Sequence, residues 1–257
     1  MANIHIPKPQ TILVIPDSHA TPGEHNDRYS WLAGLAIDIK PDVIVDIGDW
    51  WDMSSLCSYD KGTRGFHGRR YQADVAAGVE AQDRLVSPLR ARKKKMPRLV
   101  RCIGNHEHRI ERAIEREPEL LEGTIGMRDL QSREYGFEEF PFLEVVNING
   151  VNFAHYFASG VMGRPVASAR ALLTNQNATC IQGHSHTFDY ATKANVEGKR
   201  FHGIFCGVYQ DYLPDFAKAQ AYLWRPGVLV LRDVWEGDFD MEWISIQRME
   251  RTYGRVL

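Results

Sequence analysis

Short hydrophobic runs alternate with longer amphipathic segments along the first half of the chain. Three of the runs have the length and the β-branched content of strands buried on both faces, and they span residues 11–15, 43–47 and 98–103. Between them, apolar residues recur at helical spacing over residues 27–40 and 71–95. Pro41 ends the first helix, and Pro88 is expected to kink or break the second. Strands that alternate with helices in this way predict βαβ units.

The second half of the chain is richer in strands. Asn149-Gly150, a strong signal for a two-residue turn, separates two apolar runs. The pattern predicts hairpins at 143–156, 188–206 and 228–246, a single strand at 178–182, and helices at 109–117 and 164–174. Two sheets packed face to face with helices outside are therefore expected, within one domain that spans residues 1–257 and has a strand-rich part from about residue 188.

Two polar segments interrupt these elements. Residues 54–70 form a long insert that contains glycines and basic residues, and such loops in compact domains often serve function. A lid or substrate-contact role and a plain surface excursion are both left open. A basic run at 90–95 lies at the predicted end of the second helix, where cations complement the helix dipole. We favour a solvated helix end over a nucleic-acid contact for this run.

Composition narrows the class of protein. The 257 residues carry a formal charge of −2, so no overall field attracts nucleic acid or an anionic membrane. Residues 1–10 contain two prolines and no apolar run of signal-peptide length, and no run elsewhere approaches the length of a membrane span. The four cysteines, Cys57, Cys102, Cys180 and Cys206, are far apart and are predicted to be buried free thiols. We therefore expect a cytoplasmic protein with no membrane partner.

Polar residues follow five of the predicted strands directly. Loops at strand ends are where α/β proteins present reactive groups. The residues are Asp17, His19, Asp49, Asp52, Asn105, His106, His155, His184 and His186. They are too scattered for a zinc finger, but carboxylates and imidazoles at strand ends can build a site for two divalent cations such as Mn²⁺, Fe²⁺, Zn²⁺ or Co²⁺. Two metals joined by a carboxylate can share a hydroxide that attacks phosphorus, while a histidine protonates the leaving group.

These blocks resemble those of the calcineurin-like metallophosphoesterases, in the same order and over residues 17–186. They are Asp17-Ser18-His19, Gly48-Asp49-Trp50-Trp51-Asp52, Gly104-Asn105-His106-Glu107, His155 and Gly183-His184-Ser185-His186. The resemblance implies a four-layer α/β/β/α double β-sandwich of mixed sheets. It further implies that Asp17, His19 and His186 hold one metal, that Asn105, His155 and His184 hold the second, and that Asp49 bridges the two. His106 would then be the proton donor, oriented by Asp52.

The sequence departs from the Ser/Thr protein phosphatases of this family at one position. Those enzymes carry an arginine after the second aspartate of the GDxxD block, whereas this chain has Met53, which makes protein phosphatase activity doubtful. Arg109 and Arg164 are alternative candidates for binding the substrate phosphate. The insert and the segment 160–171 also resemble metallophosphoesterases encoded by bacteriophages.

The sequence therefore predicts a metal-dependent phosphoester hydrolase with two divalent ions. Mn²⁺ is our first choice, and Fe, Zn, Co and Ni are alternatives. Phosphatase and phosphodiesterase activity both stay open, and so do a nuclease that binds nucleic acid through the basic segments, a non-catalytic metal-binding scaffold, and oligomer formation. Trp50 and Trp51 are left open as a stacking surface for substrate or as a wall of the site.

Overall fold

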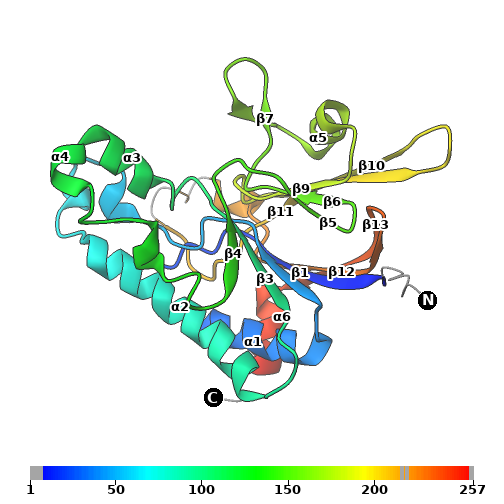
Figure 1. Ribbon diagram of the computed structural model, residues 1–257, viewed down its shortest axis with the longest axis horizontal. Helices are drawn as coiled ribbons and strands as arrows, with labels where there is room; N and C mark the ends of the chain where they lie inside the picture. Colours follow the sequence, from blue (N-terminus) through cyan, green and yellow to red (C-terminus); the bar gives the residue numbers. More distant parts are fainter. Residues whose placement is uncertain (1–7, 215–216, 218–219, 255–257) are drawn as a thin grey trace, which may run out of the picture.

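The computed structural model describes residues 8–214, 217 and 220–254, and it contains two β-sheets packed between layers of helices (Figure 1). Residues 1–7 of the amino-terminal segment considered above lie outside this range. The first sheet has the order β13-β12-β1-β2-β3-β4. Its strands are β1 (Gln10–Ile15), β2 (Val43–Asp46), β3 (Arg98–Cys102), β4 (Phe137–Phe140), β12 (Gly227–Trp235) and β13 (Asp238–Ser245). Strands β1 to β4 run parallel, and the carboxy-terminal hairpin joins them antiparallel beside β1.

The second sheet has the order β10-β11-β9-β6-β5. Its strands are β5 (Val146–Ile148), β6 (Val151–Phe153), β9 (Cys180–Gln182), β10 (Phe188–Ala194) and β11 (Arg200–Cys206). A separate two-stranded ribbon pairs β7 (Ala158–Ser159) with β8 (Arg164–Pro165). The second sheet is mixed like the first, because β6, β9 and β11 run parallel while β5 and β10 run antiparallel to their neighbours.

The helices cover the two outer faces of the sheets. Helices α1 (Asp27–Ile39), α2 (Tyr71–Ala91) and α6 (Ile246–Tyr253) lie on the first sheet, and α5 (Ala169–Gln176) lies on the second (Figure 1). Two short helices, α3 (Arg109–Arg116) and α4 (Pro118–Leu121), follow β3. The remaining helical segments are single 3₁₀ turns at Ser54–Leu56, Arg64–Phe66, Met127–Leu130 and Ala221–Leu223.

Strand β1 shows how the layers are held together. Its side chains alternate between the two faces of the first sheet, as the pleat of a strand requires. Leu13 and Ile15 pack with the helices, whereas Ile12 and Val14 pack against the second sheet. A third apolar cluster lies under α5 and includes Leu172 and Phe205. These three cores separate four layers, so the predicted α/β/β/α double β-sandwich is confirmed.

Most predicted elements are present, and the three hairpins pair as expected. Helix α2 continues through Pro88 and ends at Ala91, so of the two expected outcomes, a kink or a break, the break is excluded. The neighbouring Leu85 and Leu89 pack in the core. The helix predicted at 164–174 begins only at Ala169, because Ser168 caps it.

The four cysteines are buried and free, as predicted. Within the described residues, no helix combines the length and the apolar character that crossing a bilayer requires.

Candidate metal centre

The polar residues singled out in the sequence meet where the two sheets present the carboxyl ends of their strands. Asp17 follows β1, Asp49 follows β2 and Asn105 follows β3, and these strands are parallel neighbours. His155 follows β6 and His184 follows β9, which are parallel neighbours in the second sheet. Parallel neighbours end at the same edge, so residues far apart in the sequence converge there.

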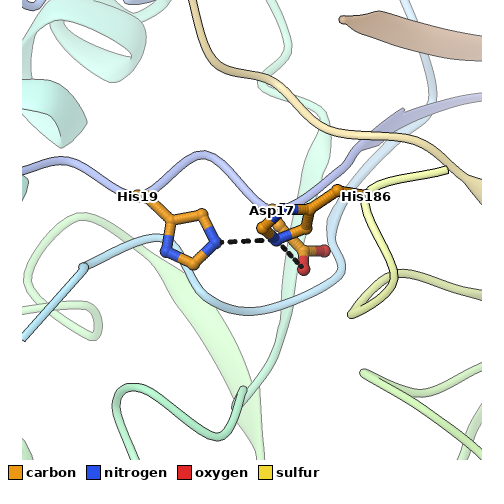
Figure 2. A group of neighbouring side chains, drawn as sticks. All are labelled: Asp17, His19 and His186. Atoms are coloured by element: carbon orange, nitrogen blue, oxygen red, sulfur yellow. Dashed lines mark hydrogen bonds and ion pairs between the residues drawn. The ribbon is translucent and has the colours of Figure 1, made fainter. Parts of the chain in front are cut away.

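The first group consists of Asp17, His19 and His186, whose potential ligand atoms all lie within 4.8 Å of one another (Figure 2). The Nε2 atoms of His19 and His186 are 3.0 Å apart, and Nε2 of His186 is 3.3 Å from Oδ2 of Asp17. The other carboxylate oxygen of Asp17 is buried and has no hydrogen-bond partner. Burying an unpaired carboxylate oxygen is costly, so the group is suited to a cation.

The second group consists of Asp49, His155 and His184. The amide oxygen of Asn105 lies 2.8 Å from Nε2 of His155 and 2.8 Å from Nδ1 of His184. Nε2 of His155 is 3.4 Å from Oδ2 of Asp49. Two imidazole nitrogens, an amide oxygen and a carboxylate thus face one another over short distances.

Asp49 also belongs to a third group with His19 and His106. Through His19 this third group shares a member with the first group, and through Asp49 it shares a member with the second. The carboxylate of Asp49 therefore lies between the two sets of ligand atoms. A single carboxylate in this position is suited to bridging two ions.

The ring of His155 is held in the orientation expected of a metal ligand. Its Nδ1 lies 3.1 Å from the carbonyl oxygen of Ile47, which can only accept a hydrogen bond, so Nδ1 carries the proton. In the neutral ring Nε2 is then the unprotonated nitrogen, and it lies near Asp49 and Asn105. A histidine ligand usually donates its other ring N–H to such a partner, which fixes both its tautomer and its orientation.

The backbone at the site is strained. His19, Asp49, His184 and His186 have φ values of 45°, 54°, 67° and 60°, in the left-handed region that residues other than glycine rarely adopt. Each such residue costs on the order of 1–3 kcal/mol, and such strain persists where the surrounding structure imposes it, often at functional sites. In this protein the four strained residues are themselves members of the candidate ligand groups.

Two glycines allow the loops to approach this closely. A side-chain carbon at Gly104 would overlap the backbone and the carboxylate of Asp49, and one at Gly183 would overlap the carboxylate of Asp17. In return, the carboxylates accept backbone hydrogen bonds across the loops, from the His106 N–H to Asp49 and from the His184 N–H to Asp17, each at 2.8 Å. The glycines thus let one loop fix the carboxylate of another.

Glu107 is a residue whose role the sequence did not indicate. Its side chain is fully buried, and its carboxylate accepts hydrogen bonds from the backbone N–H groups of Asp49, Trp51 and Gly104, at 3.0, 2.9 and 2.9 Å. Burial, and then the charge of Asp49, raise its pKa to about 7. Glu107 therefore ties the loop after β2 to the loop after β3. The only signal in the sequence was its place in the Gly104–Glu107 block.

Glu107→Gln is expected to lower both the stability of the protein and its affinity for metal. The amide can accept with one oxygen only, so at least one buried N–H loses its partner, at a cost of about 1–3 kcal/mol. Urea unfolding of the metal-free protein and metal titration would measure the two effects. Glu111→Gln is a matched control, because Glu111 is exposed and, among the described residues, its side chain pairs only with His108. An unfolding midpoint equal to that of the wild type would contradict the role of Glu107 in joining the two loops.

His106 is held between Asp52 and Arg109. Its Nδ1 is 2.6 Å from the backbone carbonyl oxygen of Asp52 and 3.3 Å from the carboxylate of the same residue. The carbonyl can only accept, so Nδ1 carries a proton and Nε2 is the nitrogen that exchanges one. Nε2 lies 3.8 Å from Asp49 and 3.1 Å from a guanidinium nitrogen of Arg109. Asp52 therefore orients the ring mainly through its main chain, whereas its carboxylate is shared with His19 at 3.4 Å.

The charges around His106 favour its protonated form. Burial lowers the pKa of His106, but the carboxylates of Asp49 and Asp52 outweigh burial and the charge of Arg109, and raise the pKa to about 9. Burial likewise opposes ionisation of Asp52, yet its contacts with His106 and His19 hold its pKa well below the usual range. The carboxylates thus favour a proton on Nε2 of His106, whereas the Arg109 guanidinium, which can only donate, favours an unprotonated Nε2 at its 3.1 Å contact.

The remaining sequence candidates have different surroundings. Arg109 donates hydrogen bonds to the carbonyl oxygens of Asp52 and Met53, at 2.9 and 3.3 Å. It therefore stabilises the loop that contains Asp52, the residue that orients His106. Arg164 is exposed on β8, and in the described part of the chain it has no hydrogen bond or ion pair with another candidate residue. Met53 is buried.

Trp50 and Trp51 are fully buried, and their ring N–H groups donate to carbonyl oxygens of α2. They are therefore part of the core beneath the site and offer no surface on which a substrate could stack.

The donor set fits divalent metal ions. Carboxylate oxygens, imidazole nitrogens and an amide oxygen converge in two adjacent groups with no lysine or arginine among them. Mixed nitrogen and oxygen donors suit Mn²⁺, Fe²⁺, Co²⁺, Ni²⁺ and Zn²⁺ alike, and do not select one of them.

Comparisons with known proteins agree with this chemistry. A family model described as calcineurin-like phosphoesterase matches residues 10–159, which include Asp17, Asp49, Asn105 and His155. No curated protein matches the chain.

Several solved structures resemble the chain at low sequence identity. Yfce, a phosphoesterase from E. coli, is 14% identical with a TM-score of 0.42, over 92% of this chain and 99% of that chain. A dimetal phosphatase from Danio rerio is 11% identical with a TM-score of 0.45, over 93% of this chain and 97% of that chain. The family match alone covers more than half of the 257 residues. The chain therefore belongs to the calcineurin-like phosphoesterases, a family of metal-dependent hydrolases.

Proposed function

We propose that this protein is a dinuclear metal-dependent phosphoester hydrolase. Asp17, His19 and His186 would hold one ion, Asn105, His155 and His184 would hold the other, and Asp49 would bridge them, with Mn²⁺ as the first choice of metal. Bound there, the two cations would supply an activated water near neutral pH and would bind the anionic oxygens of the phosphate. The observation that carries the proposal is the position of the Asp49 carboxylate between two groups of ligand atoms.

The residues around the metal groups have separate tasks in this proposal. His106, held through Nδ1 by Asp52, presents Nε2 toward the side of Asp49, where it would protonate the leaving oxygen. Arg109 contacts His106 and would bind a phosphate oxygen beside it. Arg164 stays a second candidate for substrate binding, although it makes no contact with the other candidate residues among those described.

A direct assay tests the proposal. Protein loaded with Mn²⁺ is expected to hydrolyse an aryl monophosphate or a bis-aryl phosphodiester, and chelator is expected to remove that activity. Metal analysis after dialysis is expected to find up to two ions per chain. The ratio of the two rates distinguishes a phosphatase from a phosphodiesterase. No hydrolysis of either ester by metal-loaded protein would favour a non-catalytic scaffold instead.

A nuclease is the alternative, and the basic segments support it less than the sequence suggested. Arg92, Lys94 and Lys95 follow α2 and, together with Arg98, line a cavity at the amino end of β3. Asn105 and His106 follow the opposite end of that strand. In the insert, Arg69 is paired with Asp60 at 2.6 Å. Single- and double-stranded DNA in the same assay would test this alternative directly.

A further inference from the structure

A small cavity lies beside the candidate metal centre, between the insert and helix α3. Its volume is about 200 Å³. Its lining includes Ser55, Ser58 and Tyr59 from the insert and Arg109, Arg112 and Arg116 from the helix. The cavity is therefore formed by two segments that follow the ends of β2 and β3.

Arg109 connects this cavity to the reacting groups. Arg109 lines the cavity, and a nitrogen of its guanidinium lies 3.1 Å from Nε2 of His106. The cavity is therefore separated from His106, the candidate proton donor, by a single side chain, that of Arg109.

The lining of the cavity is strongly basic. Arg109, Arg112 and Arg116 are spaced at i, i+3 and i+7, so they project from one face of α3. Among the described residues, no side-chain hydrogen bond or ion pair engages the guanidinium of Arg112 or Arg116, while the nearby Lys61 and Glu117 pair with each other at 3.7 Å. Unpaired guanidinium groups bind phosphate through paired hydrogen bonds.

A second cavity at the centre differs in charge from the first. A second cavity of about 280 Å³ is lined by His19, Asp52 and His186, and its further polar lining is Thr21, Glu24, Gln210 and Tyr212. Among the described residues that line it there are carboxylates and no arginine or lysine. An additional anionic group on a substrate would therefore be drawn to the arginine side.

Size limits what the basic cavity can hold. Pockets that enclose a whole small molecule have volumes of about 300–1,000 Å³. The basic cavity is smaller than that and fits a group of the size of a phosphate better than a nucleoside or a sugar.

We propose that the substrate carries a second phosphate group, which Arg112 and Arg116 bind in this cavity while the ester phosphate lies at the metal centre. This inference rests on the phosphoester hydrolase activity proposed above. The substrate class is then a bisphosphorylated small molecule.

The test compares linear diol bisphosphates of increasing length with the corresponding hydroxyalkyl monophosphates. For at least one length, wild-type protein is expected to show a higher kcat/KM for the bisphosphate. Arg112→Gln and Arg116→Gln are each expected to lower the ratio of the two kcat/KM values by roughly ten-fold, the range for a lost hydrogen bond to a charged group. Higher salt should reduce the ratio as well. Arg92→Gln is the control, because Arg92 is exposed and follows α2 at the other end of the sheet.

A binding measurement separates this inference from the proposed activity. Alkyl bisphosphonates are not phosphoesters, and calorimetry is expected to show that Arg112→Gln weakens their binding by a similar factor. If the protein hydrolyses monophosphates but its ratio is near one at every length, or if the ratio is the same in both variants, the second phosphate site is wrong. If no phosphoester is hydrolysed, the proposed function fails, and bisphosphonate binding unaffected by Arg112→Gln would then overturn the subsite too.

Discussion

Asp49→Asn is expected to abolish phosphoester hydrolysis and to weaken the binding of both metal ions. The Asp49 carboxylate lies within reach of His155 and His184 on one side and of His19 and His106 on the other. An asparagine keeps the volume and one oxygen but removes the negative charge that two cations would share. Partners that only orient a ligand contribute roughly 10–100-fold to metal affinity, so loss of a shared ligand should exceed that range. Metal titration and turnover of an aryl phosphate would measure the two effects.

The comparison variant is Asp240→Asn, because Asp240 is an exposed aspartate on β13, outside the ligand groups. It is expected to retain both the activity and the metal content of the wild type. Circular dichroism would show whether Asp49→Asn keeps its secondary structure. Near-normal turnover in a folded Asp49→Asn protein, or the loss of only one of the two ions with full activity, would reject the bridging role.

Some of the features that position Asp49 could be predicted from the sequence, and others could not. Its place directly after a buried strand was evident, because an apolar run followed by Gly48-Asp49 marks the end of a strand in an α/β protein. Its convergence with His155 and His184, which follow strands of the other sheet, was implied by the family resemblance. The hydrogen bonds that hold the loop of Asp49 in place could not be predicted from the sequence. Glu107 and its three backbone donors depend on how two loops meet, which no local pattern encodes.

A buried charge pair beneath the site was equally hidden. Arg101 and Asp46 are fully buried and lie side by side on β3 and β2, with their charged groups 2.5 Å apart. Asp46 also accepts a hydrogen bond from the N–H of Gly48. In the sequence the two residues appear only as polar interruptions of apolar strands. The strand register that pairs them follows from packing of the whole sheet, as does strand β4, whose residues 137–140 have no alternating pattern.

The misplaced helix boundaries have a similar cause. Helical spacing over 164–174 was real, but Ser168 accepts a hydrogen bond from the N–H of Ala171 and so begins α5 later, while residues 164–165 pair with β7. Periodicity indicates which residues share a face, whereas caps and strand pairing decide where a helix begins. The four layers could therefore be predicted, and the cavity between the insert and α3 could not.

His106→Asn is expected to keep both metal ions and to lose roughly 10²–10⁴-fold in kcat, the contribution of a general acid. The carbonyl oxygen of Asp52 fixes Nδ1 of His106 as a donor, so Nε2 remains to deliver a proton on the side of Asp49. In the metal-free protein the neighbouring carboxylates raise the pKa of His106 to about 9, which favours its protonated form. Asparagine can still donate a hydrogen bond to Asp52 but cannot transfer a proton.

The choice of leaving group makes this expectation sharper. A nitrophenolate leaves without a proton, so the variant should lose much less rate on a nitrophenyl ester than on an alkyl ester. His108→Asn is the matched control, since the His108 ring hydrogen-bonds only Glu111 and belongs to none of the ligand groups. Equal losses on the two esters would remove His106 from the role of proton donor. Loss of metal from the His106→Asn protein would make it a ligand instead, in the group that it forms with His19 and Asp49.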